Sequence, residues 1–291
     1  MDFNKYYEDR QKLVNTFLEK RLEKKGISRV DEAMAYSLLA GGKRIRPIIL
    51  MATADALGVS GYNFLPVACG LEMIHTYSLI HDDLPCMDDD EYRRGRLTNH
   101  KVFGEALALL AGDALLTLAF EVMLEQKNVP AEALVETVRE VAMCAGNFGM
   151  VGGQVIDLDS EGRQISEEEL RKLHAGKTGA LFIAAVRSGA RLSGAASDEL
   201  LALTKFADLL GLAFQITDDI LDVEGDAAQM GKAAHSDEKK HKSTYVTLYT
   251  LEGAKALAQK TVDEALGRLE MFGENAEALR EITKMMCGRK S

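Results

Sequence analysis

The most chemically distinctive part of the sequence is an acidic stretch at residues 79–95, LIHDDLPCMDDDEYRRG. Six carboxylates lie within the ten residues from Asp82 to Glu91, and two arginines follow shortly after them. Two carboxylates about 4 Å apart repel by roughly 4 kcal/mol at an effective dielectric near 20, which is a large fraction of the stability of a domain. A cation or a positively charged group is therefore expected to offset this repulsion.

The acidic stretch begins at the end of a predicted helix, because apolar side chains recur at helical spacing over residues 71–80. Asp82 and Asp83 then lie at the helix C-terminus, which has partial negative charge and favours cations. A solvated run of acidic residues is not expected at that position. Pro85 interrupts the helix, which allows Asp88 to return to the face of Asp82. Converging carboxylates of this kind suit Mg²⁺.

A second acidic cluster, FQITDDILD, lies at residues 214–222. Gln215, Asp218 and Asp222 share one helical face, while Phe214 and its apolar neighbours face the core. A single cluster of this kind is more often a solvated helix face than a metal site. Two clusters with matching geometry, roughly 130 residues apart, favour a metal site.

Basic side chains are grouped in three short motifs. GGKRIRP supplies Lys43 and Arg46 just after two glycines, and RRGR follows the acidic stretch at residues 93–96. Arginine and lysine in such places suit phosphate oxygens. The third motif, AGKTGA, is similar to a P-loop, but that motif requires a glycine where the chain has Arg171, so a nucleotide P-loop is rejected.

The composition predicts an all-α chain with one large core. Apolar residues recur every three or four positions, and no linker rich in Pro, Ser or Gly divides the 291 residues. The net charge of -10 argues against nucleic acid as a partner. The four cysteines are scattered, the N-terminus has no signal-peptide pattern, and we expect no transmembrane segment. A reducing cytoplasm fits these features.

Local signals predict where several helices begin and end. Gly41 and Gly42 close a helix that begins near Val30, Pro130 suits the first turn of another, and Ser166 with Glu169 has the spacing of a capping box. Residues 224–243 mix glycine with charge and lack apolar periodicity, so we expect a loop or lid there.

Five motifs together give the chain a resemblance to the trans-prenyl diphosphate synthase family: GGKRIRP, LIHDDLPCMDDDEYRRG, GGQVIDL, GKTGAL and FQITDDILD. The resemblance implies the all-α isoprenoid synthase fold, a bundle of roughly ten or more helices around a central cavity. It also implies a single polyprenyl synthetase domain over residues 1–291 and a homodimer. The two acidic clusters would face each other across the mouth of the cavity.

The resemblance also assigns roles to residues. The implied metal ligands are Asp82, Asp83, Asp88, Asp218, Asp219 and Asp222. The implied isopentenyl diphosphate pocket is Lys43, Arg46, His75 and Arg94. The implied allylic diphosphate pocket is Arg93, Lys177, Thr178, Gln215, Lys232 and Lys242. The residues implied in catalysis are Asp82, Asp83, Asp88, Arg93, Lys177, Asp218 and Lys232.

The implied activity is a Mg²⁺-dependent, head-to-tail condensation of isopentenyl diphosphate with dimethylallyl and geranyl diphosphate. The family implies three Mg²⁺ per site, with Mn²⁺ as a substitute. Tyr77 with Ser78, five and four residues before Asp82, together with the two extra residues between Asp83 and Asp88, resembles bacterial farnesyl diphosphate synthases. We therefore expect a fifteen-carbon product, with Tyr77 as the floor of the cavity.

Two groups of residues in these motifs have a second explanation or depart from the family pattern. Gln154 and Asp157 of GGQVIDL share a helical face, but a structural hydrogen bond would explain their spacing equally well. The family often has glycine at the position of His235, which weakens the assignment of Lys232 and Lys242.

Four other functions stay open at this stage. A geranylgeranyl diphosphate synthase would share every motif, and a terpene cyclase would share the fold but would not need the isopentenyl diphosphate pocket. An HD-type metal phosphohydrolase could use His81 and Asp82 with His75, but it leaves the second acidic cluster unexplained. A non-catalytic partner subunit would not need intact aspartates.

Overall fold

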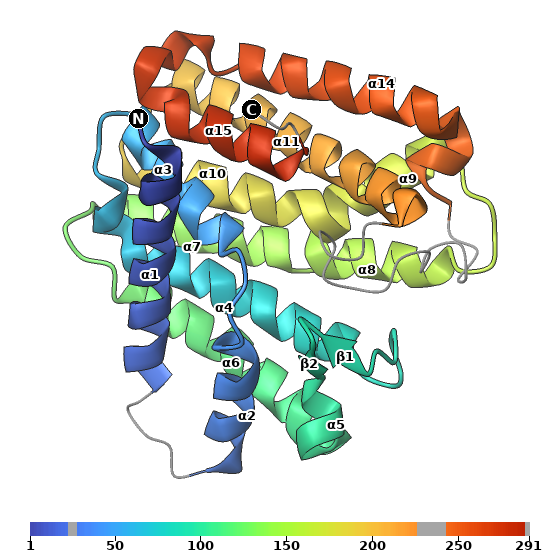
Figure 1. Cartoon of the computed structure of the whole chain (residues 1–291). Helices are drawn as coiled ribbons and strands as arrows, with labels where there is room; N and C mark the ends of the chain where they lie inside the picture. Colours follow the sequence, from blue (N-terminus) through green and yellow to red (C-terminus); the bar gives the residue numbers. More distant parts are fainter. Residues whose placement is uncertain (23–27, 226–242, 289–291) are drawn as a thin grey trace.

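The computed structural model describes residues 1–22, 28–225 and 243–288, and α-helices form most of its regular structure (Figure 1). The helices of the first half are α1 (Phe3–Leu22), α2 (Arg29–Leu38), α3 (Ile45–Ala56), α4 (Leu65–Asp82), α5 (Asn99–Phe103), α6 (Glu105–Leu124) and α7 (Ala131–Ala145). Those of the second half are α8 (Met150–Asp159), α9 (Glu167–His174), α10 (Ala180–Leu192), α11 (Ser197–Glu224), α14 (Tyr245–Gly267) and α15 (Glu277–Met286).

Short elements connect some of these helices. They are the 3₁₀ turns η1 (Gly61–Phe64) and η3 (Glu270–Ala276), the π-helical turn η2 (Ala175–Gly179), and the strands β1 (Tyr92–Arg93) and β2 (Arg96–Leu97), which pair as an antiparallel hairpin. Apart from this hairpin, the all-α prediction with roughly ten or more helices is confirmed.

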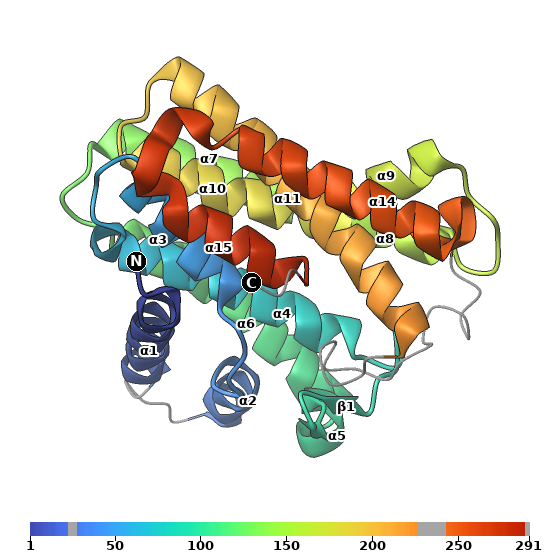
Figure 2. The ribbon, with the colours of Figure 1, turned by 45° about the horizontal axis from the view of Figure 1, so that its top comes forward.

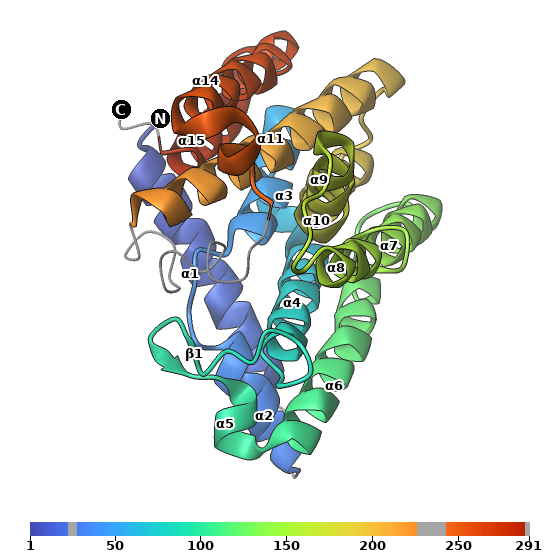
Figure 3. The same ribbon diagram turned by 90° about the vertical axis from the view of Figure 1, so that its right-hand side faces the viewer.

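The core is centred on α3 and α4. Most residues of both helices are buried, as expected for helices surrounded by others on every side. α4 packs against α6, α3, α2 and α1, while α10 packs against α3, α7 and α11 (Figures 2 and 3). This packing fixes the C-terminal end of α4, where the first acidic cluster begins.

The predicted helix ends are confirmed, except that Pro130 lies one residue before the first turn of its helix. The helix after Ser28 ends at Leu38, shortly before the two glycines, and Pro130 is the N-cap residue of α7. The Ser166 hydroxyl accepts a hydrogen bond from the Glu169 backbone N–H, while the Glu169 side chain accepts one from the Ser166 backbone N–H at 3.0 Å. The single domain over residues 1–291 stays a prediction.

Two helices, α6 and α11, are long and apolar enough to cross a membrane by length and composition alone. The expectation of no transmembrane segment therefore stays a prediction. Both helices also pack in the helical bundle, with 39% and 44% of their apolar windows buried inside the protein. Core helices pass the same test, so this is weak support for a span.

Candidate active site

The first acidic cluster begins where α4 ends. Asp82 is the last residue of the helix and Asp83 is its C-cap. After Pro85 the chain turns back, and the backbone N–H of Asp88 donates to the carbonyl oxygen of Asp82 at 2.9 Å. The predicted return of Asp88 to Asp82 is therefore confirmed for the backbone.

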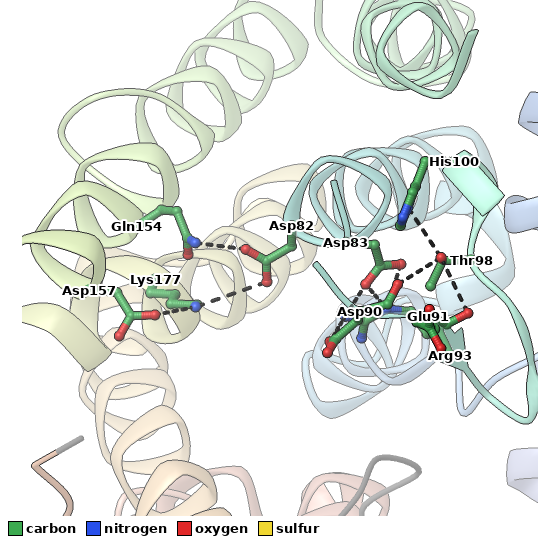
Figure 4. Close-up of polar contacts among 10 residues, drawn as sticks. All are labelled: Asp82, Asp83, Asp90, Glu91, Arg93, Thr98, His100, Gln154, Asp157 and Lys177. Atoms are coloured by element: carbon green, nitrogen blue, oxygen red, sulfur yellow. Dashed lines mark hydrogen bonds and ion pairs between the residues drawn. The ribbon is translucent and has the colours of Figure 1, made fainter. Parts of the chain in front are cut away.

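The side chain of Asp82 points toward α8 and η2 (Figure 4). Its Oδ1 accepts a hydrogen bond from Gln154 Nε2 at 2.7 Å, and its Oδ2 lies 4.0 Å from Lys177 Nζ. Burial raises the pKa of Asp82; Lys177 opposes this rise and the charge of Asp88 adds to it. The two carboxylates thus form an electrostatically costly pair that a cation would stabilise.

Asp83 points to the opposite side of α4 (Figure 4). Its carboxylate pairs with the Arg93 guanidinium, with Nε–Oδ1 at 2.8 Å and Nη2–Oδ1 at 2.6 Å. Burial raises the pKa of Asp83 to about 6, although Arg93 acts against this rise. Burial also lowers the pKa of Arg93, but the hydrogen bond and charge of Asp83 outweigh it, so the pKa of Arg93 is raised. The structure therefore does not bring Asp83 to the contacts that Asp82 makes.

Two further acidic residues of the stretch are paired with nearby cations. Asp90 Oδ2 lies 3.7 Å from Arg93 Nη2, and Glu91 Oε1 accepts from Lys101 Nζ at 3.0 Å. Part of the carboxylate repulsion is thus offset within the protein, whereas the charge of Asp88 adds to the cost of ionising Asp82.

Lys177 lies on the π-helical turn η2 and binds Asp157 of α8, with Nζ–Oδ2 at 2.6 Å. Burial lowers the pKa of Lys177, but the charges of Asp82 and Asp157 outweigh it, so the pKa is raised and the ammonium stays charged. Gly153 makes this contact between elements possible, because a Cβ there would lie 2.0 Å from the Lys177 backbone N. GGQVIDL therefore contributes Gln154 and Asp157 to the site, which sequence reasoning left open.

The second acidic cluster lies on α11, where Asp218 is half-buried and Asp222 is buried. Asp219 is also buried, and its Oδ2 accepts from the Tyr245 backbone N–H at 2.8 Å. Gln215 Nε2 donates to Asp219 Oδ1 at 3.3 Å, while Gln215 Oε1 accepts from the Thr178 hydroxyl at 3.1 Å. The turn η2 therefore joins the two clusters, with Lys177 beside Asp82 and Thr178 on Gln215.

Basic side chains gather between the start of α3 and the hairpin. Burial lowers the pKa of Arg46 to about 10, and its Nε is buried without a hydrogen-bond partner. Burial together with the charges of Arg46 and Arg94 lowers the pKa of His75 well below its ordinary value, so this imidazole is neutral. Arg94 donates to the Gly41 carbonyl oxygen. This group of side chains therefore includes a buried donor without a hydrogen-bond partner, and Lys43 is exposed nearby in the sequence; its binding of an anion stays a prediction.

The hairpin directs neighbouring arginines to different places. Arg94 and Gly95 both have positive φ, 54° and 73°, as a two-residue type I′ turn requires. Arg93 then reaches Asp83, whereas Arg94 reaches the loop before α3. The two arginines assigned to different pockets by sequence are thus separated by the geometry of one turn.

Tyr77 lies one turn before the end of α4 and is 6% exposed. Its ring packs edge-on against His81, with centroids 5.6 Å apart, and the Ser78 hydroxyl donates to the His75 carbonyl oxygen. Burial raises the pKa of the Tyr77 phenol. The role of Tyr77 and Ser78 in chain length stays a prediction.

The described part of the chain also contains two cavities. One, of about 30 Å³, lies behind the hairpin and is lined by Tyr36, Thr76, Asp83 and Arg93 among others. The other, of about 300 Å³, lies between α11, α14 and the end of α15. Within residues 1–22, 28–225 and 243–288, neither cavity is lined by Asp82 or Asp218.

The donor chemistry fits Mg²⁺, which binds one or two carboxylates together with water and substrate phosphate. Among the described residues, no three His, Cys, Asp or Glu side chains converge closely enough to hold a metal ion by themselves. The protein would therefore supply only some of the ligands of each Mg²⁺. Asp82 and Asp88 would contribute on one side of the site, and Asp218 on the other. Lys232, Lys242 and His235 lie outside the described residues.

Comparison with known proteins identifies one family along most of the chain. The polyprenyl synthetase family model matches residues 27–286. The chain is 44% identical to farnesyl diphosphate synthase of Geobacillus stearothermophilus, covering 99% of this chain and 98% of that one. It is 44% identical to geranylgeranyl diphosphate synthase of Cyanophora paradoxa, covering 98% and 96%. The crystal structure of an FPP/GFPP synthase from Zymomonas mobilis superposes with a TM-score of 0.88 at 36% identity, covering 98% and 99%.

Proposed function

Because the chain belongs to the polyprenyl synthetase family, we propose that it is a prenyltransferase making (E,E)-farnesyl diphosphate. It joins isopentenyl diphosphate head to tail to dimethylallyl diphosphate and then to geranyl diphosphate. The observation that carries this proposal is the turn η2, where Lys177 lies by Asp82 and Thr178 binds Gln215. One short segment thereby links both acidic clusters to diphosphate-binding donors.

The allylic diphosphate binds beside η2. Lys177 and Thr178 donate to its phosphate oxygens, and Arg93 and Gln215 donate from either side; Lys232 and Lys242 are proposed to complete this set. Asp82, Asp83, Asp88, Asp218, Asp219 and Asp222 are the proposed ligands of three Mg²⁺, for which Mn²⁺ could substitute. When bound, Mg²⁺ neutralises negative charge that develops on the leaving diphosphate.

The reaction begins when the allylic C–O bond breaks and diphosphate leaves with the electron pair. Lys177 and Arg93 stabilise the departing charge, because preorganised donors act most strongly where charge develops. The double bond of isopentenyl diphosphate then attacks the allylic carbocation and forms a C–C bond. This leaves a carbocation on the isopentenyl unit. The carbon next to that cation loses a proton to the departing diphosphate, and the electron pair of the broken C–H bond forms the new double bond. Diphosphate takes the proton because no side chain in the described site is placed as a dedicated base.

Isopentenyl diphosphate binds in the separate pocket of Lys43, Arg46, His75 and Arg94. The unpartnered Nε of Arg46 and the neutral imidazole of His75 supply hydrogen-bond donors to its diphosphate. Holding the two substrates in separate charged pockets orients the double bond toward the allylic carbon and removes much of the entropic barrier.

Tyr77 and Ser78 are proposed to set the length of the product, because both lie on α4 before Asp82 and Tyr77 is a bulky buried side chain. The geranylgeranyl diphosphate synthase of Cyanophora paradoxa is as similar to this chain as the farnesyl enzymes are. A twenty-carbon product is therefore the main alternative. The HD-type phosphohydrolase is disfavoured, because His81 Nε2 contacts the Leu109 carbonyl oxygen at 3.0 Å on neighbouring α6.

We also propose a cytoplasmic homodimer. Large apolar side chains are exposed along α6, α7 and α8, which pack in sequence, and a second copy of the chain would cover them. These residues are Leu109, Leu110, Leu124, Val135, Met143, Phe148, Val151 and Val155. Phe148, at 86% exposure, is the most exposed among them. The scattered cysteines and acidic net charge support a cytoplasmic location without nucleic acid.

Product analysis tests the proposed function. The purified protein is incubated with Mg²⁺, isopentenyl diphosphate and dimethylallyl or geranyl diphosphate, and the dephosphorylated alcohols are separated by carbon number. Farnesol is the expected main product. Geranylgeraniol would support the longer-chain alternative, and hydrocarbons from farnesyl diphosphate alone would support a cyclase. Phosphate release without isopentenyl diphosphate would support a phosphohydrolase, and inactivity would support a non-catalytic subunit.

A further inference from the structure

The loop between α2 and α3 has an unusual backbone. Gly41 and Gly42 have φ of 80° and 118°, and Arg44, the N-cap residue of α3, has φ of 51° in the left-handed region. Left-handed backbone is unfavourable for an arginine by itself, so contacts around it must hold it there. Lys43 and Arg46, two members of the isopentenyl diphosphate pocket, lie on either side of Arg44.

Side chains capture three successive carbonyl oxygens of this loop. Arg94 donates to the Gly41 oxygen, Gln11 Nε2 donates to the Gly42 oxygen at 2.9 Å, and the Tyr7 hydroxyl donates to the Lys43 oxygen. Each carbonyl carries partial negative charge that would repel a diphosphate. A hydrogen bond from a side-chain donor to each oxygen offsets part of this negative charge. It also fixes the orientation of each peptide unit.

Two of these donors come from α1, and a third residue of the same helix joins them. Tyr7, Gln11 and Asn15 are spaced by four, so they form one stripe along α1. Asn15 Oδ1 accepts a hydrogen bond from Arg44 Nε at 2.9 Å. The stripe thus contacts three consecutive residues of the loop, and α1 lies beside α2 and α3 (Figure 1).

Arg44 anchors the loop from the other side. Its Nη1 binds Glu72 of α4 at 2.9 Å and its Nη2 donates to the Leu38 carbonyl oxygen at 2.7 Å. The side chains of Arg44 and Glu72 are 1% and 2% exposed. Arg44 therefore faces inward and ties together α1, α2 and α4. Of the three cations in GGKRIRP, this leaves Lys43 and Arg46 for substrate.

We propose that Tyr7 and Gln11 of α1 are positioning residues for the isopentenyl diphosphate pocket, acting through the loop that carries Lys43 and Arg46. The inference rests on the proposed function but goes beyond it. α1 lies before residue 27, where the family match begins, and none of its side chains is assigned to either substrate. Neither residue touches substrate; each fixes a peptide unit that aims a substrate-binding cation.

The test uses the full chain with Gln11→Leu, Gln11→Met and Tyr7→Phe. Gln11→Met keeps an unbranched side chain of similar length and removes the donor without adding charge, so it separates hydrogen bonding from packing and from electrostatics. Loss of one hydrogen bond corresponds to about a fivefold change in binding. We expect the KM and the calorimetric Kd for isopentenyl diphosphate to rise about fivefold in each Gln11 variant and in Tyr7→Phe. The KM for geranyl diphosphate should stay unchanged.

Asn4→Leu is the matched control, because Asn4 is an exposed amide in the first turn of the same helix. It should leave both KM values unchanged. An unchanged KM and Kd for isopentenyl diphosphate in the Gln11 variants would overturn the inference. Equal rises for both substrates would also overturn it, because they would indicate a general loss of structure. Product formation by the unaltered protein tests the proposed function separately.

Discussion

At the scale of single residues, Asp82 and Asp83 show how adjacent identical side chains acquire different environments. Successive helical residues are about 100° apart, so Asp82 turns toward Gln154 and Lys177 while Asp83 turns toward Arg93. Asp82 is half-buried near another carboxylate, whereas Asp83 is buried and already paired with an arginine. The proposed metal site therefore depends on Asp82 more than on Asp83.

This difference predicts unequal effects of the same substitution. Asp82→Asn should lower kcat by about 10²- to 10³-fold, the usual loss when a group that stabilises transition-state charge is removed. Asp83→Asn should lower kcat by about tenfold or less, because the amide oxygen still accepts from Arg93. Steady-state rates across a series of Mg²⁺ concentrations check this, with circular dichroism as a control for folding. Equal losses in both variants would contradict it.

The neutral state of His75 predicts a pH dependence of stability. Burial and the nearby arginines lower the folded-state pKa of His75 well below 6.5. Below pH 6.5 the unfolded chain therefore binds a proton that the folded chain does not, and the free energy of unfolding falls as the pH drops. The contribution is at most about 1.4 kcal/mol per pH unit.

His75→Gln should therefore flatten the loss of stability between pH 6.5 and the lower folded-state pKa. Urea unfolding of both proteins at about pH 7.5 and 5.5 measures this difference. A parallel loss of stability in the variant and the unaltered protein would show that other groups cause it.

At the scale of elements, close backbone approaches decide where functional side chains lie. Gly153 brings α8 against η2, and Gly112 brings α6 against α4 at His81. The π-helical turn η2 shifts Lys177 and Thr178 relative to a regular helix, a feature often found at functional sites. Each contact brings together residues far apart in the sequence. With α8 packed against η2, for example, Lys177 lies 4.0 Å from Asp82.

The contact between α6 and α4 gives an element-scale prediction. A Cβ at Gly112 would lie 2.1 Å from His81 Nε2, so Gly112→Ala must displace His81 next to Asp82. We expect a loss of about 1–3 kcal/mol in the free energy of unfolding, typical of overpacking. Gly267→Ala is the matched control, because a Cβ there would meet open space. Denaturant unfolding checks both, and equal stability of the two variants would contradict the prediction.

Sequence reasoning predicted the helix ends and the end of α4 because caps, proline and apolar spacing are local signals. It could not predict that Asp83 pairs with Arg93, because that pair depends on the turn at Arg94 and Gly95. It also left Asp157 open, since only packing of α8 on η2 shows its contact with Lys177. The π-helical turn was missed because AGKTG contains no proline, and its two glycines do not distinguish a π-helical turn from a loop or a regular helix.

At the scale of the whole molecule, burial is uneven. α3 and α4 are enclosed, whereas α6, α7 and α8 leave large apolar side chains exposed. Apolar surface of this kind on consecutive packed helices is typical of an interface. A homodimer would bury this surface. Because α6 packs against α4, contacts on α6 from the second copy would also help to hold α4 in place.

This surface predicts a concentration-dependent assembly. Phe148→Asp combined with Leu110→Asp should raise the dimer dissociation constant by at least about tenfold, because burial of each large apolar side chain contributes about 1.5–3 kcal/mol. Sedimentation velocity over a range of concentrations measures the change. Met271→Asp, on exposed η3, should leave assembly unaltered. A monomeric unaltered protein would contradict the prediction.

The stripe on α1 also determines how far the N-terminus can be shortened. A recombinant fragment beginning at residue 27 would retain every cation assigned to substrate, yet it would lack Tyr7, Gln11 and Asn15. Arg44 Nε would lose its acceptor, and the carbonyl groups of Gly42 and Lys43 would be left to solvent. Such a truncation would preserve the recognisable motifs while loosening the loop that arranges them, so motif content alone is a poor guide to the smallest active unit.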